Sequence, residues 1–283
     1  MDVKLLLIVA IMLLVLLAVS WPWYQQYRRH QQIAATAFPT AWRKMLRSHL
    51  PFYRYLPSDI QLRLKKLIQL FLAEKQFIGC DGLVVTEQMR LQIAAQACLL
   101  MVNRTGPLYP SLQSILIYPS AFAVKQAQTN AMGVVSESTQ VRLGESWQQG
   151  KVILSWLDSQ KGAASFDDGQ NVVIHEFAHQ LDQENGGANG APRLPTTQAY
   201  RDWSQVFTQE FELLQRQLAS GQQPLFDPYA ATNPAEFFAV STELFFEKPQ
   251  QLQAQHRALY QQLQRYYQLD PAQWFITKPL LSD

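Results

Sequence analysis

The sequence predicts an α+β fold, mostly helical with a small mixed sheet, preceded by one N-terminal transmembrane helix. Three observations predict it: an uncharged apolar run near the N-terminus, several segments with apolar residues at helical spacing, and a central cluster of short β-branched or alternating segments. Residues 1–30 form the predicted membrane anchor and juxtamembrane segment, and residues 31–283 form the predicted domain. The predicted domain is long enough to bury a substantial hydrophobic core.

The apolar run covers residues 5–19, and with the aromatic group at residues 21–24 it approaches the roughly 20 residues needed to cross a bilayer. Aromatic residues are typical of the membrane interface. Basic residues lie mainly after the run, from Arg28 onward, which predicts a single-pass membrane protein with its domain in the cytoplasm. The alternative is export after cleavage of a signal peptide at the small residues 18–20.

The elements of the domain follow from periodicity and from helix-capping residues. A loop containing Gly and Pro, from Asn185 to Pro195, separates the central elements from the C-terminal helices. The predicted helices cover residues 58–75, 86–103, about 171–182, 197–218, 233–248 and a C-terminal segment through Tyr267, and the predicted strands cover residues 114–119, 133–143 and 151–156.

Composition excludes some classes of function. The net charge is +2, and no basic stripe lies outside the juxtamembrane region, so we expect no direct binding of nucleic acid. Cys80 and Cys98 are the two cysteines, and free thiols in a reducing compartment are expected.

The most informative segment is His-Glu-Phe-Ala-His at residues 175–179, which is flanked by apolar residues. Two histidines four residues apart on a helix lie about 6 Å apart along its axis on one face, so both imidazoles can bind one tetrahedral zinc. Glu176 would stand beside the metal, where a carboxylate can take a proton from water that attacks a carbonyl. The alternative is a buried helix whose histidines are hydrogen-bonded without a metal. Asp167 or Asp168 could cap the helix start.

Such a site needs a third protein ligand. The other histidines lie far upstream, or at His256 in a Gln-rich stretch that is typical of a solvated helix, so a carboxylate is favoured. Glu236 lies in an apolar helix whose start is marked by Asn233 and Pro234. Glu243 shares its face, as a partner that supports a ligand would. The predicted ligands of one Zn²⁺ per chain are His175, His179 and Glu236.

Over roughly residues 40 to 270 the chain resembles the Mlc titration factor A type metallopeptidases. The resembling stretches are residues 144–147, 152–156, 167–179, 188–190 and 233–239. The resemblance implies a zincin-like metallopeptidase domain with a gluzincin-like site of two His and one Glu, and it places the third ligand on Glu236. The catalytic domain of the lethal factor toxin is similar near this helix and implies a catalytic role for Tyr229, whose phenol could hydrogen-bond an oxyanion or protonate the leaving amine. The alternative is a tyrosine that anchors a loop.

Together these features predict a zinc-dependent peptidase that acts on a peptide or protein substrate with Glu176 as general base. The resemblance implies aminopeptidase-like activity. Some members of the family bind a transcriptional repressor of sugar uptake, so the alternative is a regulatory binding protein that sequesters such a repressor, with secondary or no peptidase activity. The features that favour catalysis are intact His175, Glu176, His179, Glu236 and Tyr229. A pure binder has no chemical need for Glu176.

The strand at residues 151–156 comes just before the helix that carries the two histidines. In zincins an edge strand at this place pairs with the substrate backbone. An interior position for the strand is the alternative.

Overall fold

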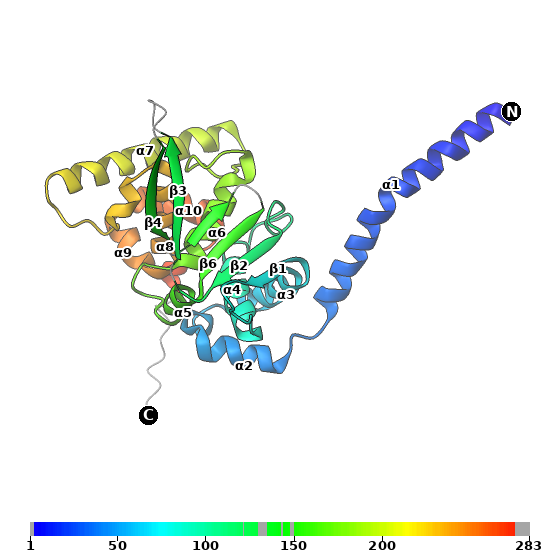
Figure 1. Cartoon of the computed structure of the whole chain (residues 1–283). Coiled ribbons are helices and arrows are strands. Elements are labelled where there is room, and N and C mark those ends of the chain that lie inside the picture. The colour runs from blue at the N-terminus through cyan, green and yellow to red at the C-terminus, as the bar shows by residue number, and fades with distance from the viewer. Residues whose placement is uncertain (1–2, 121, 130–134, 143, 148–149, 275–283) are drawn as a thin grey trace.

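The computed structural model describes residues 3–120, 122–129, 135–142, 144–147 and 150–274 (Figure 1). It is mostly helical with a small mixed sheet, which confirms the predicted α+β class. The helices are α1 (Val3–Ala35), α2 (Thr40–His49), α3 (Ser58–Glu74), α4 (Glu87–Leu99), α5 (Trp156–Ala164), α6 (Val172–Asp182), α7 (Thr197–Ala219), α8 (Pro234–Glu247), α9 (Pro249–Gln255) and α10 (Arg257–Tyr267). The strands are β1 (Gln76–Gly79), β2 (Ser114–Tyr118), β3 (Phe122–Thr129), β4 (Val135–Arg142), β5 (Gly144–Trp147) and β6 (Lys151–Ser155). Short 3-10 helices include η1 (Pro51–Arg54), η2 (Gln183–Asn185), η3 (Pro228–Ala231) and η4 (Pro271–Gln273).

The main sheet has the strand order β1-β2-β6-β5, and β3 and β4 form a separate antiparallel hairpin. β1, β2 and β6 are parallel, whereas β5 runs antiparallel to β6. β6 is buried from Val152 to Ser155, as expected for a strand covered on both faces. The sequence left open whether this strand lies at the edge or in the interior of the sheet. The structure shows the interior position, between β2 and β5. Among the described strands, β5 lies next to β6 at the end of the strand order and forms one edge of the main sheet.

Helix α6 lies at the centre of the molecule. It contacts β5 and β6 on the sheet side, α4 and α5 beside it, and α8 on the opposite side. The ring of Phe177 lies 4.9 Å from that of Tyr109 and 5.8 Å from that of Phe71, measured between centroids. These aromatic contacts fix α6 within the core, so the direction in which its polar side chains point is determined by packing.

Helix α8, which carries the predicted ligand Glu236, is buried along nearly its whole length. Trp203 and Phe207 of α7 stack on each other with their centroids 4.0 Å apart, and both contact the Phe238 ring of α8. Tyr266 of α10 adds a further edge contact to Trp203. This aromatic layer holds α8 against α6.

The long predicted helices are confirmed, but one environment was predicted wrongly. His256 is buried, not solvated, and its Nδ1 lies 2.7 Å from Glu210 Oε2 of α7. Its ring also meets Phe226 edge-on, with 5.1 Å between the centroids. The Gln-rich composition describes the exposed face of this region, whereas His256 belongs to the face that packs on α7.

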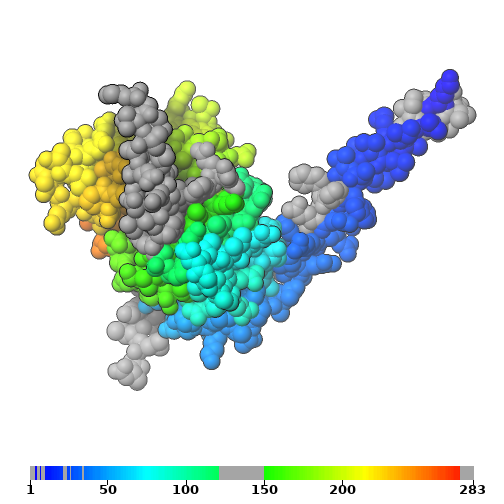
Figure 2. Space-filling view, in the orientation of Figure 1, coloured from blue at the N-terminus to red at the C-terminus, as the bar shows by residue number. Residues whose placement is uncertain are grey.

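Helix α1 is formed as predicted and projects from the rest of the molecule (Figures 1 and 2). Its C-terminal part contacts α3, where Arg29 Nη2 donates to the carbonyl of Ala73 at 3.3 Å and His30 pairs with Glu74 at 2.7 Å. Within the described part of the chain, no helix combines the length and the apolar character required of a membrane span. The predicted transmembrane helix is therefore not supported.

Candidate metal centre

The start of α6 is defined by Asn171. Its side-chain Oδ1 accepts a hydrogen bond from the backbone N–H of Ile174 at 3.1 Å, which satisfies an otherwise unpaired N–H of the first turn. The predicted cap at Asp167 or Asp168 is wrong, because Asn171 is the residue directly before the first helical residue and fills the N-cap position. Asp168 instead accepts from the N–H of Gln170 at 3.0 Å and stabilises the turn before the helix.

The start of α8 follows the sequence prediction. Asn233 is the N-cap, its Oδ1 accepts from the N–H of Glu236 at 3.0 Å, and Pro234 occupies the first helical position. The cap thereby places Glu236 in the first turn of α8, facing α6.

Gly190 allows the loop after α6 to approach the α8 start closely. Its φ is +76°, and a Cβ there would lie 2.3 Å from the carbonyl oxygen of Pro234. Its N–H donates to Asp182 Oδ2 at 2.8 Å, and its carbonyl accepts from Trp203 Nε1 at 2.9 Å. The glycine thus links the end of α6, the start of α8 and the aromatic layer.

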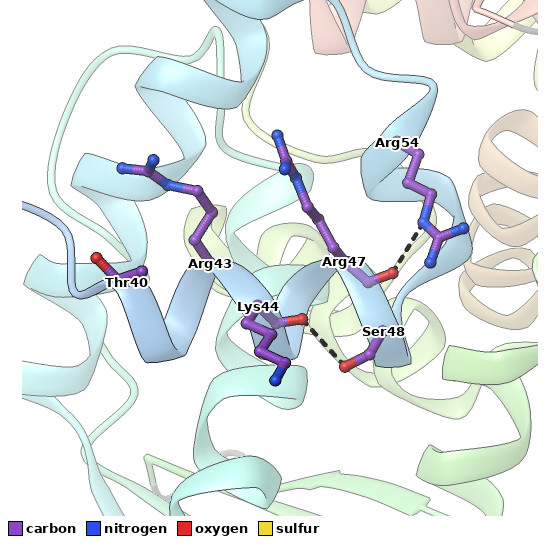
Figure 3. A pocket seen from close by; sticks show the side chains of 6 residues that line it. All are labelled: Thr40, Arg43, Lys44, Arg47, Ser48 and Arg54. Carbon is purple, nitrogen blue, oxygen red and sulfur yellow. Dashed lines mark hydrogen bonds between the residues drawn. The ribbon is translucent and has the colours of Figure 1, made fainter.

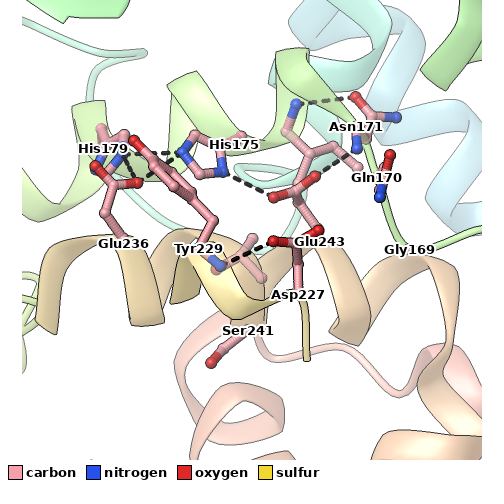
Figure 4. Close-up of polar contacts among 12 residues, drawn as sticks. Gly169, Gln170, Asn171, His175, His179, Asp227, Tyr229, Glu236, Ser241 and Glu243 are labelled. Carbon is pink, nitrogen blue, oxygen red and sulfur yellow. Dashed lines mark hydrogen bonds and ion pairs between the residues drawn. The ribbon is translucent and has the colours of Figure 1, made fainter. Parts of the chain in front are cut away.

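Three donor atoms converge between the two helices (Figure 4). His175 Nε2 lies 3.0 Å from Glu236 Oε2, His179 Nε2 lies 3.3 Å from the same oxygen, and the two Nε2 atoms are 3.2 Å apart. Ligands about 2.0–2.1 Å from a tetrahedral zinc are separated by about 3.3 Å, so this triangle has the size of one face of a zinc coordination sphere.

Glu243 determines which nitrogen of His175 faces that triangle. Its Oε1 lies 2.7 Å from His175 Nδ1, and its Oε2 accepts from the backbone N–H of Asn171. If Nδ1–H donates to the carboxylate, Nε2 presents a lone pair toward Glu236 and His179. Three converging lone pairs repel one another unless a cation lies between them, so the residues fit a bound metal ion.

Burial and neighbouring charges set the protonation of the donors. Burial lowers the pKa of His179, which favours its neutral form. Burial alone would raise the pKa of Glu236, but hydrogen bonds from His175 and His179 hold this pKa far below its ordinary value. For His175, burial acts downward, yet the carboxylates of Glu243 and Glu236 raise its pKa well above the usual range, so without a metal its Nε2 holds a proton toward Glu236 that a bound metal ion would replace. Glu236 is therefore an anionic donor at neutral pH, as a metal ligand must be.

The two predicted catalytic residues differ in their exposure. Glu176 follows His175 directly in α6 and is 4% exposed. Tyr229 lies in η3 and is 53% exposed, with its ring centroid 6.1 Å from that of His175 (Figure 4). Asp227 Oδ1 accepts from the N–H of Tyr229 at 2.8 Å and fixes the start of η3. The Glu176 side chain is thus buried next in sequence to one donor residue, and the Tyr229 phenol is exposed near the His175 ring.

Sequence reasoning missed the network behind Glu243. Asn171 Nδ2 donates to Gln96 Oε1 at 2.8 Å and to Glu247 Oε1 at 2.9 Å, and Gly169 N–H donates to Glu247 Oε2 at 2.9 Å. Burial raises the pKa of Glu247 well above its ordinary value. The available signal was the spacing of Glu243 and Glu247, one helical turn apart in an otherwise apolar helix.

Comparison with known proteins agrees with this geometry. Residues 24–268 match the family described as Glucose-regulated metallo-peptidase M90. The chain belongs to this metallopeptidase family. Its M90 relatives include an uncharacterized protein of Synechocystis, 44% identical over 93% of this chain and 97% of its own length.

Two further M90 relatives carry the name Mlc titration factor A. The protein from Escherichia coli O1:K1 is 34% identical over 90% of this chain and 93% of its own length. The protein from Serratia proteamaculans is 35% identical over 89% of this chain and 94% of its own length. The predicted resemblance to the Mlc titration factor A type is thus confirmed, and membership of a metallopeptidase family implies a metal.

Proposed function

We propose that the protein is a zinc-dependent peptidase that hydrolyses bonds in a peptide or protein substrate. The observation that carries the proposal is the triangle of His175 Nε2, His179 Nε2 and Glu236 Oε2, with sides of 3.0 to 3.3 Å. Two imidazoles and one carboxylate are the donor set of many catalytic zinc sites, which leave a fourth position open. Membership of the M90 metallopeptidases supports the same class of activity.

Zinc held by His175, His179 and Glu236 would act as a Lewis acid that acidifies water and polarises a carbonyl. Glu176 accepts a proton from the attacking water and can pass it to the leaving amine. The hydroxyl of Tyr229 donates a hydrogen bond to the oxygen that gains negative charge. Glu243 keeps the His175 ring oriented through Nδ1.

The substrate backbone is proposed to pair with β5. This strand forms the edge of the main sheet within the described residues and contacts α6, the helix of the two histidines. An extended peptide added to an edge strand gains main-chain hydrogen bonds independent of its side chains. Because the N–H groups of successive residues point to opposite sides of a strand, one of Glu145→Pro and Ser146→Pro removes a donor on the unpaired side, and that variant should raise KM more than it lowers kcat.

The proposed catalysis is tested by Glu176→Gln, which preserves shape but removes the base. Zinc content and fold should be retained, while kcat falls about 10²- to 10⁴-fold. Glu212→Gln, at an exposed site on α7 that pairs with Arg216, is the matched control and should hydrolyse a peptide library at the wild-type rate. Hydrolysis by Glu176→Gln as fast as by wild type would assign the activity to another site.

Aminopeptidase-like specificity is a finer proposal. It rests on the resemblance alone and predicts that peptides with a free α-amine are cleaved, whereas N-acetylated copies of the same peptides are not. Equal cleavage of both sets would identify an endopeptidase.

A regulatory role is the second candidate, favoured by the name Mlc titration factor A that relatives carry. In this proposal the chain binds a transcriptional repressor in addition to, or instead of, cleaving peptides. Because binding needs no general base, Glu176→Gln should retain the repressor in a pull-down. A repressor that binds neither variant nor wild type would leave the peptidase as the function.

The cellular location is also a proposal. Apolar side chains such as Leu13, Leu14 and Leu16 of α1 are more than half exposed, which supports attachment to the bacterial inner membrane. The basic residues from Arg28 onward favour a domain in the cytoplasm. Carbonate-washed membranes should retain the full chain, and reporters fused after residue 50 should indicate the cytoplasm. Recovery of a mature chain that begins at Trp21 would support export.

A further inference from the structure

A second charged feature lies on α2 and η1, outside the candidate metal centre. A groove of about 420 Å³ is lined by the residues labelled in Figure 3. Four of them are cationic, two carry hydroxyl groups and none is acidic. They are Thr40, Arg43, Lys44, Arg47, Ser48 and Arg54, and we call this site the α2 groove.

The cations of the α2 groove are brought together without an acidic partner. Arg43 and Arg47 are one helical turn apart and project to the same side of α2 (Figure 3). Arg54 is drawn toward them because its Nε donates to the carbonyl oxygen of Arg47 at 2.9 Å. In the part of the chain that the structure describes, none of the four cations forms an ion pair with a carboxylate.

The surrounding sequence provides no acid to balance this charge. The chain has no Asp or Glu between Asp2 and Asp59. The nearest carboxylate bonded to α2 is that of Glu87, which accepts from Trp42 Nε1 at 2.7 Å. Like charges one helical turn apart destabilise a helix, so α2 carries an electrostatic cost that a bound anion would remove.

The chemistry of the groove favours a phosphoryl group. Arginine presents a planar fork of N–H donors that matches phosphate oxygens, and several arginines around one concave site can bind a doubly charged anion. The groove is also larger than a single chloride or carboxylate requires and lies in the size range of small-molecule sites. The first turn of α2 contains no acidic residue and has no side-chain cap, so no side chain offsets the partial positive charge of its N–H groups, which favours an anion.

We propose that the α2 groove binds a phosphoryl anion, supplied either by a phosphate ester in solution or by the headgroup of an anionic phospholipid. The ligand lies among Arg43, Arg47 and Arg54, with Lys44 and the hydroxyl groups at its rim. This site is separate from the donor triangle and does not depend on peptidase activity.

The test compares two double variants of the full chain in mild detergent. R43Q/R47Q removes two charges from the α2 groove, and R201Q/R257Q removes two exposed charges from α7 and α10 as the matched control. Inorganic phosphate is titrated by calorimetry at low ionic strength. Wild type and control should bind alike, whereas R43Q/R47Q should bind at least about tenfold more weakly, because it lacks two of the charged donors to the anion.

A second arm distinguishes the two sources of the phosphoryl group. Vesicles of phosphatidylcholine with or without phosphatidylglycerol are mixed with the same three proteins. Binding that needs phosphatidylglycerol and is lost in R43Q/R47Q supports the lipid headgroup, and phosphate binding without this lipid dependence supports a soluble ester. Phosphate should also raise the melting temperature of wild type and control but not of R43Q/R47Q. Equal affinities in both double variants, or no binding of either probe by wild type, would overturn the proposal.

Discussion

Tyr229 is the exposed member of the candidate site, and its hydroxyl is the group that separates a catalytic role from a structural one. Tyr229→Phe removes only this hydroxyl, so we expect kcat to fall more than KM rises, as for a group that acts chiefly in the transition state. Steady-state kinetics on a defined peptide measures both constants. A loss of thermal stability with unchanged kcat would instead indicate that the residue anchors η3.

Asp182 links the pH of the solution to the stability of the fold. Burial raises its pKa from 3.8 to about 6, against the opposing effect of hydrogen bonds from the Gly190, Ala191 and Asn189 N–H groups. The folded protein therefore holds the proton more tightly than the unfolded chain. The resulting contribution to the free energy of unfolding amounts to up to about 3 kcal/mol. It is fully present below about pH 4 and is lost as the pH rises through 6.

Asp182→Asn should remove this dependence. We expect the free energy of unfolding in urea to change less between pH 4 and pH 7 in the variant than in wild type. Parallel pH profiles for the two proteins would show that Asp182 does not titrate in this range.

Sequence spacing located the residues of the site better than it located their supporting partners. The histidines and Glu236 could be inferred because their positions follow from one helical turn and one N-cap. The contact of His256 with Glu210 spans 46 residues of chain, so no local pattern indicates it. The cap at Asn171 was missed because Asp167 and Asp168 lie close by, and aspartate and asparagine are equally common N-cap residues.

At the scale of elements, the position of α8 depends on its close contact with the loop after α6. Gly190→Ala places a Cβ against the Pro234 carbonyl and requires a left-handed backbone conformation. The conformation alone costs about 1–3 kcal/mol, and the clash must shift the start of α8. We expect lower stability in urea and a weaker zinc affinity, because Glu236 lies in that first turn.

Gly187→Ala is the matched control for this variant. It lies in the same loop, and a Cβ there meets no atom within 4 Å. It should leave stability and zinc affinity near the wild-type values. If both substitutions had the same effect, the flexibility of the loop and not the contact with Pro234 would explain the result.

The elements that the sequence missed are short or are defined by distant partners. α2 and α5 each contain ten residues or fewer, and β1 and β5 contain four each, which is too little for a periodic pattern. The order of β6 and β5 in the sheet could not be inferred either, since an apolar strand fits both an interior and an edge position before its neighbours are known.

For the whole molecule, the candidate site joins two packed layers. α6 belongs to the layer that contacts the sheet, and α8 belongs to the aromatic layer with α7 and α10. A metal bound by His175, His179 and Glu236 would connect the two layers and stabilise the folded state in proportion to its affinity. Metal content, fold stability and hydrolysis are therefore expected to change together when a ligand is removed.

The most direct test of the account is the zinc content of purified ligand variants. Wild type should contain one zinc per chain, and His179→Ala and Glu236→Ala should lose both zinc and peptide hydrolysis. His49→Ala, which removes a histidine at the end of α2, should keep both. The measurement is elemental analysis after dialysis, together with a peptide digest and a circular dichroism spectrum to verify folding. Stoichiometric zinc retained in a folded His179→Ala variant would contradict the assignment of the site.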